Sequence, residues 1–198
     1  MIESIIEFWF GPLAGPEDFT RDRYEIWFRH GRTYDALIRE RVGVVYKQAC
    51  RGELDAWTAT PRGRLALILL LDQFSRHIHR DTPLAFAQDR KTQALTRTGV
   101  ALGHDQRLFS IQRTFFYLPL EHAEDLALQE ESVALFSQLA AEVAPALKPD
   151  FEGFLEYARH HRDVIAQFGR FPDLNPLLGR DSTAEESAFL RQPGSSFL

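Results

Sequence analysis

The chain has one cysteine, no long hydrophobic run and no glycine-rich motif. With Cys50 alone, neither an intrachain disulfide nor a cluster of thiolate metal ligands can form. No catalytic signature surrounds Cys50, so we interpret it as a small buried hydrophobic residue. The longest apolar run, from Leu65 to Leu71, is far shorter than the roughly 18 residues of a membrane span. The first residues carry neither a basic region nor a cleavage site, which predicts a cytoplasmic protein.

The motifs of the enzyme classes that can be identified from sequence are also missing. The chain contains no P-loop, HExxH, GxSxG, Rossmann glycine fingerprint or CxxC. It also lacks the paired Glu-x-x-His elements of a di-iron bundle. We therefore predict no cofactor and no metal. The net charge of −5 argues against nucleic acid or a membrane surface as a partner.

What the sequence does contain is helical periodicity. Apolar residues recur with a period near 3.6, and strand-like alternation is scarce. Thr60-Pro61 has the pattern of an N-cap followed by a first-turn proline, and Thr183 with Glu186 has the spacing of a capping box. The length of 198 residues favours one domain over residues 1–198. We predict helices near 2–10, 17–30, 32–50, 61–79, 83–102, 111–128, 129–146, 150–168 and 184–191.

The segment from Arg64 to Phe74 is apolar nearly all round, which predicts the central and most buried helix. Its end mixes charged residues into buried positions. Asp72 and Arg76 stand four residues apart and therefore face one side of the helix. Two interpretations stay open: a structural ion pair that closes the bundle, or an anion-binding Arg76 oriented by Asp72.

A second polar segment begins at Arg113. Pro119 is expected to start a new helical turn or to kink the old one. After it, His122 and Asp125 share one face, with Gln129 four residues further on. A histidine and an aspartate one turn apart can be half of a metal site, a general acid–base pair or a hydrogen bond between helices.

A third polar segment covers residues 157–175. His161 is predicted to face the core, and Gly169 is predicted to end the helix. Arg170 follows on a tight turn, and turn residues that a rigid helix positions are favoured for ligand contact. The alternative is that Arg170 and Arg180 satisfy carbonyl groups at a helix C-terminus.

Three strings, LALILLLDQFSRHIHR, RTFFYLPLEHAEDLALQE and HRDVIAQFGRFPDLNPLLGRDST, resemble the bacterial family DUF924, a domain of unknown function placed in the TPR-like superfamily. The resemblance runs from EFWFG near the start to AEESAFL near the end. It implies an all-α, single-domain, TPR-like stack of antiparallel helical hairpins. Members of that family usually carry His-Arg-Asn where this chain has Asp173-Leu174-Asn175.

Three functions remain open. The first is a binding module for a small anionic molecule or a peptide segment. The second is a small-molecule hydrolase or isomerase in which His122 or His161 is the general base, oriented by Asp125. The third is a scaffold whose interaction surface includes Trp9, Phe10, Trp27 and Phe28, although packing between the first two helices also explains these aromatics. The candidate site residues are Asp72, Arg76, Arg113, His122, Asp125, His161, Arg170 and Asn175.

Overall fold

The computed structural model describes residues 1–18, 22–29 and 31–196, and the regular elements within these ranges are all helical. The helices are α1 (Ile2–Phe10), α2 (Asp22–Tyr24), α3 (Gly31–Cys50), α4 (Pro61–Ile68), α5 (Ser75–Ile78), α6 (Asp89–Ala101), α7 (Ser110–Glu121), α8 (Leu126–Glu142), α9 (Lys148–Phe168) and α10 (Ala184–Phe189). Two π-helices, η1 (Glu25–Arg29) and η3 (Leu69–Phe74), and short 3-10 turns join them. The predicted all-α class is thus confirmed.

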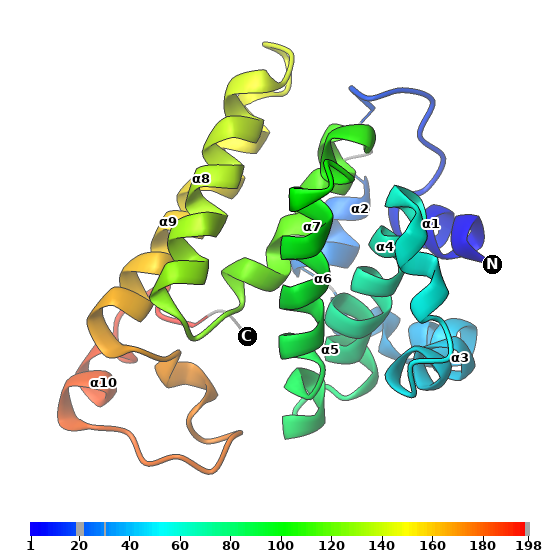
Figure 1. The fold of residues 1–198 in the computed structure, drawn as a ribbon. Helices are drawn as coiled ribbons and strands as arrows, with labels where there is room; N and C mark the ends of the chain where they lie inside the picture. The colour runs from blue at the N-terminus through cyan, green and yellow to red at the C-terminus, as the bar shows by residue number, and fades with distance from the viewer. Residues whose placement is uncertain (19–21, 30, 197–198) are drawn as a thin grey trace.

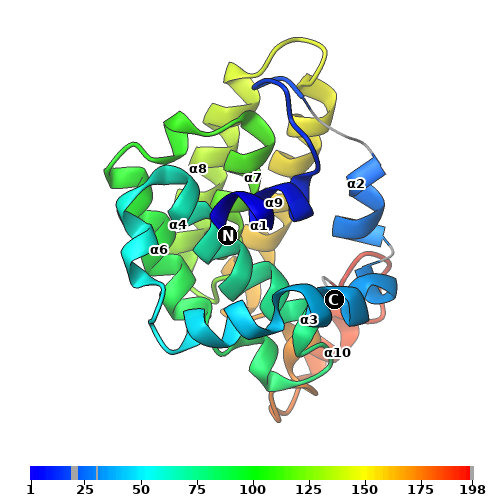
Figure 2. The ribbon, with the colours of Figure 1, turned by 90° about the vertical axis from the view of Figure 1, so that its right-hand side faces the viewer.

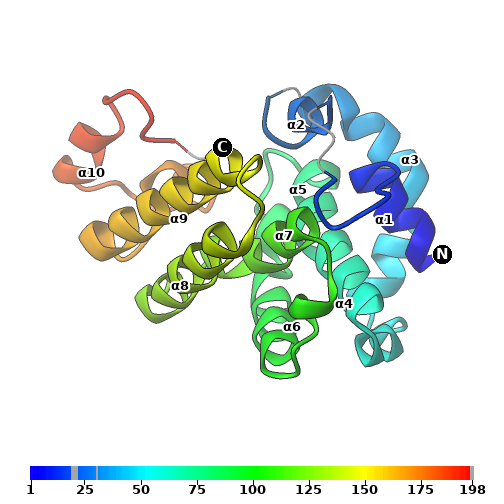
Figure 3. The same ribbon diagram turned by 90° about the horizontal axis from the view of Figure 1, so that it is seen from above.

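Consecutive long helices pack as antiparallel neighbours. Helices α8 and α9 lie side by side along their length, and α7 packs against both α6 and α8 (Figures 1 and 3). Helix α3 packs on α5 and η3, while α1 covers α4 (Figure 2). No described helix is both long and apolar enough to cross a membrane.

The central element is a continuous run of helical turns made by α4, η3 and α5. As predicted, its apolar part is the most buried stretch of the chain, since every residue from Leu65 to Leu71 is 0% exposed. The Thr60 hydroxyl accepts a hydrogen bond from the Gly63 amide and so caps α4. The π-helical turn η3 occupies the second half of this run, and Asp72 is one of its residues.

Most predicted helix boundaries agree with the structure to within a few residues. The Thr183–Glu186 capping box is present, and Gly169 ends α9 with a positive φ of 70°. The helix predicted over 17–30 falls partly on residues outside the described ranges. The sequence also leads us to expect that Phe197 and Leu198 dock against the bundle, and both lie outside the described ranges.

The helix predicted over 111–128 is wrong in one respect. Pro119 lies inside α7, which continues to Glu121, and the chain then breaks before α8. Asp125 is the N-cap of α8: its carboxylate accepts hydrogen bonds from the amides of Ala127 and Leu128. Asp125 therefore belongs to a helix start and not to the helical face that carries His122, because the break separates them.

The aromatics proposed as an interaction surface are mostly core residues. Trp9, Phe10 and Trp27 are at most 9% exposed and pack against each other and Phe115. Only Phe28 is exposed, at 44%. The surface suggested from the sequence is therefore absent, because these side chains join the first helices to the core. Cys50, predicted to be buried, is half-buried at the edge of the core.

The segment after α9 forms a small second core. Val164, Ile165 and Phe171 are buried together there, with Phe168 and Phe189 packed around them. This segment carries α10 and folds back along α9, on the side away from α1 and α3 (Figures 1 and 3). Its position brings residues 171–177 beside the ends of α7 and α9.

Candidate functional site

A cleft of about 800 Å³ lies where the main bundle meets the segment after α9. Helices α7 and α9 supply its inner walls, and the two π-helices contribute Trp27, Phe28 and Gln73. Residues 171–177 close one side. Because π-helical turns are uncommon and occur often at functional sites, their presence on two walls of one cleft singles out this region.

Asp72 is the buried anchor of the cleft. Its carboxylate is 0% exposed and accepts hydrogen bonds from His122 Nδ1 at 2.9 Å and from Gln73 Nε2 at 2.6 Å. The Arg76 guanidinium lies 3.3 Å away, so the ion pair predicted from the spacing is present. Burial alone would raise the pKa of Asp72, but Arg76 and His122 outweigh burial and hold that pKa well below its ordinary range.

His122 follows the last residue of α7, and its side chain is 20% exposed. The Asp72 carboxylate only accepts hydrogen bonds, so the proton between the two residues belongs to His122 Nδ1. In the neutral ring this leaves a lone pair on Nε2. Among the described residues no partner bonds Nε2, and His122 lines the cleft. This geometry orients an imidazole so that its second nitrogen can accept a proton from a bound molecule.

Glu121 precedes His122 and is buried, at 2% exposure. Burial, with a smaller contribution from the negative charge of Asp72, raises the pKa of the Glu121 carboxyl to about 8. His161 Nδ1 lies 3.6 Å from Glu121 Oε1, and burial lowers the pKa of His161 to about 3. Near neutral pH the contact therefore joins a protonated carboxyl to a neutral imidazole and is not an ion pair. His161 Nδ1 instead donates to the Tyr157 carbonyl at 2.9 Å.

One face of α7 presents these groups in a row. Thr114, Leu118, Glu121 and His122 all line the cleft at helical spacing. The Thr114 hydroxyl is fully buried, and it forms no hydrogen bond with any described group. A buried polar group without a partner is costly, so it calls for a specific explanation such as a ligand or water.

The arginines of the cleft are all engaged in ion pairs. Arg76 binds Asp89 through two hydrogen bonds of 3.0 and 3.2 Å, in addition to Asp72. Arg80 binds Asp35 through two bonds of 2.6 and 2.8 Å. Arg32 binds Asp81 through two bonds of 2.8 and 3.2 Å. No arginine of the described lining is thus left over for an anionic ligand.

The rest of the lining is largely aromatic. Phe28 stacks on Phe115 with ring centroids 6.1 Å apart and lies 5.9 Å from Phe154. Tyr157 contacts the His161 ring edge-on at 4.7 Å. A further set of rings borders the same space: Tyr24, Trp27, Phe86, Phe136 and Phe171. The cleft therefore combines an apolar wall with a few polar groups at one end, as small-molecule sites usually do.

Four of the eight sequence-predicted site residues meet here: Asp72, Arg76, His122 and His161. Arg113 lies elsewhere, buried between Glu142 at 2.8 Å and the Tyr117 hydroxyl at 3.2 Å. Asp125 caps α8 and does not contact His122 in the way expected. Its predicted partnership fails because Asp72, fifty positions earlier in the chain, takes that place.

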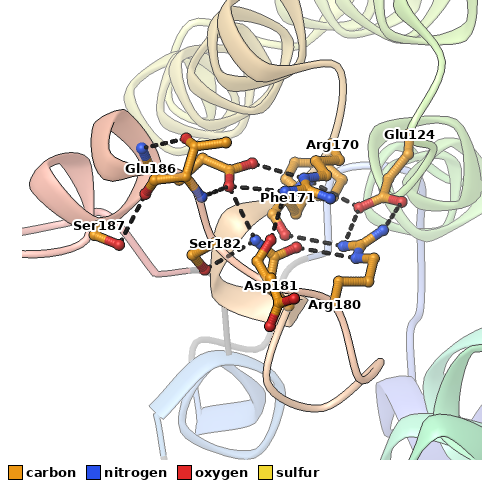
Figure 4. Close-up of polar contacts among 10 residues, drawn as sticks. Glu124, Arg170, Phe171, Arg180, Asp181, Ser182, Glu186 and Ser187 are labelled. Atoms are coloured by element: carbon orange, nitrogen blue, oxygen red, sulfur yellow. Dashed lines mark hydrogen bonds and ion pairs between the residues drawn. The ribbon is translucent and has the colours of Figure 1, made fainter.

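The other two, Arg170 and Asn175, belong to a separate polar network that we call the C-terminal clamp (Figure 4). Arg170 donates to both carboxylate oxygens of Glu186, at 2.6 and 2.8 Å. Asn175, 0% exposed, donates to Glu186 and accepts from Arg180 Nε at 2.9 Å. Arg180 in turn binds Glu124 through two bonds of 2.7 and 2.8 Å. Neither predicted residue lines the cleft.

The clamp nonetheless positions one wall of the cleft. The Glu124 carboxylate accepts a hydrogen bond from the Phe171 amide at 2.8 Å, and Arg180 donates to the Phe171 carbonyl at 3.2 Å (Figure 4). Phe171 faces the cleft and contacts the ring of His161. Asp173 and Leu174, where the family usually has His and Arg, also lie on this wall.

Two functional groups were not singled out from the sequence, Thr114 and Glu121. Every residue of α7 from Ile111 to Glu121 is buried, so no exposed polar face of this helix indicates from the sequence which side chains are functional. The available signal was the occurrence of a hydroxyl and a carboxylate within such a fully buried run, since unpaired acids are rarely buried. Among the described residues, no three His, Cys, Asp or Glu side chains gather as a metal site.

Comparison with known proteins gives a family and a fold. A family model described as bacterial protein of unknown function (DUF924) matches residues 5–194. A solved structure of a protein of unknown function, ATU0120 from Agrobacterium tumefaciens, is similar, with 34% sequence identity over 96% of each chain and a TM-score of 0.79. A search of curated proteins found no match.

Proposed function

The chain belongs to DUF924, a family of bacterial proteins of unknown function, and from the cleft itself we propose that it binds a small organic molecule with an apolar body and an uncharged hydrogen-bonding head. The observation that carries the proposal is the row on α7. The Thr114 hydroxyl and His122 Nε2 have no partner among the described residues, yet both border the cleft. A bound polar head at His122 would satisfy Nε2, and the Thr114 hydroxyl, about 12 Å away along the helix axis, would need a second polar group of the same molecule.

The size and lining favour a small molecule over a peptide segment. A volume of about 800 Å³ is within the range of small-ligand pockets. The aromatic wall around Phe28 and Phe154 suits a flat apolar body, because aromatic contacts contribute beyond the area they bury.

An uncharged head fits better than the anion predicted from the sequence. Arg76, Arg80 and Arg32 are each neutralised by a carboxylate. An anion next to Glu121 would also face the negative charge of Asp72, which already disfavours ionisation of Glu121. A carbonyl oxygen, in contrast, can accept a hydrogen bond from the protonated Glu121 carboxyl.

Three probes with one aromatic body test the proposal: phenylacetone, phenylacetate and 2-phenylethylammonium, each titrated by saturation-transfer NMR. We expect phenylacetone, the uncharged ketone, to bind most tightly. Tighter binding of phenylacetate would instead support the anionic ligand. Equal and unsaturable signals from all three would contradict a cleft-binding role.

A matched pair of variants locates the binding. Phe28 and Leu126 are both 44% exposed, but only Phe28 lines the cleft. Phe28→Ala is expected to weaken phenylacetone binding about fivefold, which corresponds to about 1 kcal/mol of lost aromatic contact. Leu126→Ala should leave binding unchanged. Equal effects of the two substitutions would place the probe outside the cleft.

A further inference from the structure

The polar end of the cleft has the parts of a proton-transfer site. His122 offers Nε2, and its ring is fixed by a 2.9 Å hydrogen bond from Nδ1 to the buried Asp72 carboxylate. The residue before it, Glu121, supplies a carboxyl group and also lines the cleft. A base oriented by a buried carboxylate, opposite hydrogen-bond donors, is the arrangement that general acid–base catalysis requires.

We propose that the cleft catalyses proton transfer at the carbon next to a carbonyl group of a small, largely apolar molecule, with His122 Nε2 as the base and the Glu121 carboxyl as the donor to the carbonyl oxygen. The inference rests on the binding role proposed above and adds a reaction to it. Asp72 is a positioning residue, because it acts through His122 and does not face the ligand.

The step balances without any co-reactant. The C–H bond next to the carbonyl breaks, and its proton goes to His122 Nε2. The electron pair forms a carbon–carbon double bond while the carbonyl π pair moves onto oxygen, and the resulting enolate oxygen accepts a hydrogen bond from the Glu121 carboxyl, which keeps its proton. The imidazolium then returns its proton to the same or to a second carbon, which gives exchange or isomerisation and restores the site. Nothing is oxidised or reduced.

The protonation states of the free protein suit these roles. Burial raises the pKa of Glu121 to about 8, so the carboxyl carries a proton at neutral pH and can donate it. Asp72 stays ionised because Arg76 and His122 hold its pKa low, and it therefore stabilises the imidazolium that forms during the reaction. Two carboxyl groups in one site, one protonated and one ionised, are typical of sites in which one group donates a proton or hydrogen bond and the other stabilises a positive charge.

The apolar wall supports the same chemistry. A dry, aromatic environment strengthens hydrogen bonds to the charge that develops on the carbonyl oxygen. Phe28, Phe154 and Phe171 supply aromatic rings to the lining of the cleft. His161, kept neutral by burial beside Glu121, adds no charge that would compete with the transfer.

The test uses phenylacetone in D₂O, with loss of its benzylic proton signal followed by NMR. In the wild type the His122 proton exchanges with solvent, so each abstraction is followed by return of a deuteron. We expect exchange above the buffer rate that saturates with phenylacetone. His122→Asn should lower it about 100-fold, since general bases typically contribute 10²–10⁴-fold. An asparagine amide can still donate to Asp72, which preserves the fold.

Control variants separate catalysis from structure. His160→Asn changes an exposed histidine that does not line the cleft and should leave exchange unchanged. Glu121→Gln should retain part of the rate, because its amide still donates a hydrogen bond. In the wild type the exchange rate is expected to fall above about pH 8, as Glu121 loses its proton, and this fall should be absent in Glu121→Gln. Asp72→Asn should lower the rate at saturating phenylacetone more than it changes the KM, as expected for a misoriented base.

The outcomes distinguish the two proposals. Saturable phenylacetone binding with equal exchange in wild type and His122→Asn would overturn the catalytic inference and leave the binding role intact. Absence of binding by all three aromatic probes would overturn both. Exchange lost equally in His122→Asn and His160→Asn would assign it to general imidazole catalysis and would also overturn the inference.

Discussion

The cleft and the C-terminal clamp are neighbouring polar clusters that differ in how completely they are satisfied. In the clamp, Glu124 and Glu186 each accept from an arginine and from at least one backbone amide. In the cleft, the Thr114 hydroxyl and His122 Nε2 have no partner in the described part of the chain, and the Glu121 carboxyl is protonated in a buried position. A satisfied network stabilises a fold, whereas an unsatisfied buried group calls for an explanation such as a ligand or water.

The clamp and the cleft also differ in where their ion pairs lie. Each arginine of the clamp meets a carboxylate: Arg170 pairs with Glu186 within the segment, and Arg180 joins the segment to Glu124 in the connection between α7 and α8 (Figure 4). The cleft also uses such pairs, but only at its base, where Asp72 and Arg76 fix His122. We therefore expect substitutions in the clamp and at the base of the cleft to cost stability, and substitutions at the polar end of the cleft to cost function.

The largest loss of stability is expected at the base of the cleft. Asp72→Asn removes the buried charge that pairs with Arg76, and breaking a buried ion pair by removing one partner costs about 3–5 kcal/mol. Because Arg76 keeps Asp89, we expect a loss of about 3 kcal/mol in the free energy of unfolding, measured by urea denaturation.

Asp125→Asn is the control for that substitution. It makes the same chemical change at a helix N-cap, where Asn and Asp are equally good, so its effect should be close to zero. A similar loss in both variants would mean that the Asp72–Arg76 pair contributes nothing specific.

Glu121 in the cleft and Glu186 in the clamp should make the stability of the protein depend on pH in opposite directions. Burial raises the pKa of Glu121 from its ordinary 4.5 to about 8 in the folded protein. The folded state therefore binds the extra proton between these values, and stability falls as pH rises from 4.5 to 8. Glu121→Gln should match the wild type near pH 5 and exceed it at pH 8 by as much as about 4 kcal/mol. A difference that does not change with pH would show that Glu121 is ionised in the folded protein.

Glu186 should behave in the opposite way. The hydrogen bonds from Arg170 lower its pKa to about 2 from an ordinary 4.5. Its contribution to stability is fully present above 4.5 and is lost as pH falls towards 2. We expect Glu186→Gln to be less stable than the wild type at neutral pH, with the difference shrinking in acid. Urea denaturation of both variants at several pH values measures the two trends together.

The clamp also has a central uncharged residue. Asn175→Ala removes a fully buried amide that joins Arg180, Ser182 and Glu186, so we expect a loss of about 2 kcal/mol from unmade hydrogen bonds and lost packing. Ser187→Ala, which removes an exposed hydroxyl bonded to the Thr183 carbonyl, should cost much less. If the two losses were equal, the clamp would not depend on its buried centre.

Local chemistry explains why the helices could be predicted and the site only in part. The Thr60 cap, the Thr183–Glu186 box and the Gly169 turn each act over a few residues, so the sequence displays them directly. The Asp72–Arg76 pair was visible for the same reason, since it spans one helical turn.

The partner of His122 could not be identified because it is distant in sequence. Asp125 stands three residues away and suggested a pair, but the chain breaks after α7, and the His122 ring turns towards Asp72 on η3. The π-helical turn that places Asp72 leaves no clear sequence signal. Asn175 and Arg170 were predicted as ligand contacts because polar residues on a turn occur both in ligand-binding sites and in structural hydrogen-bond networks. Only the positions of Glu186 and Glu124 in the folded chain show that these residues belong to a structural network.

The smallest effect on stability is expected at Thr114, and it tests the comparison most directly. Thr114 and Thr96 are both fully buried helical threonines, but the Thr96 hydroxyl donates to the Phe116 carbonyl at 2.8 Å, whereas the Thr114 hydroxyl has no described partner. Thr96→Val should therefore cost about 1 kcal/mol. Thr114→Val should be neutral or slightly stabilising, because it removes an unpaired buried polar group, yet it should weaken phenylacetone binding. A loss of stability in Thr114→Val equal to that in Thr96→Val would mean that the Thr114 hydroxyl is already satisfied in the free protein, and the case for a ligand there would fail.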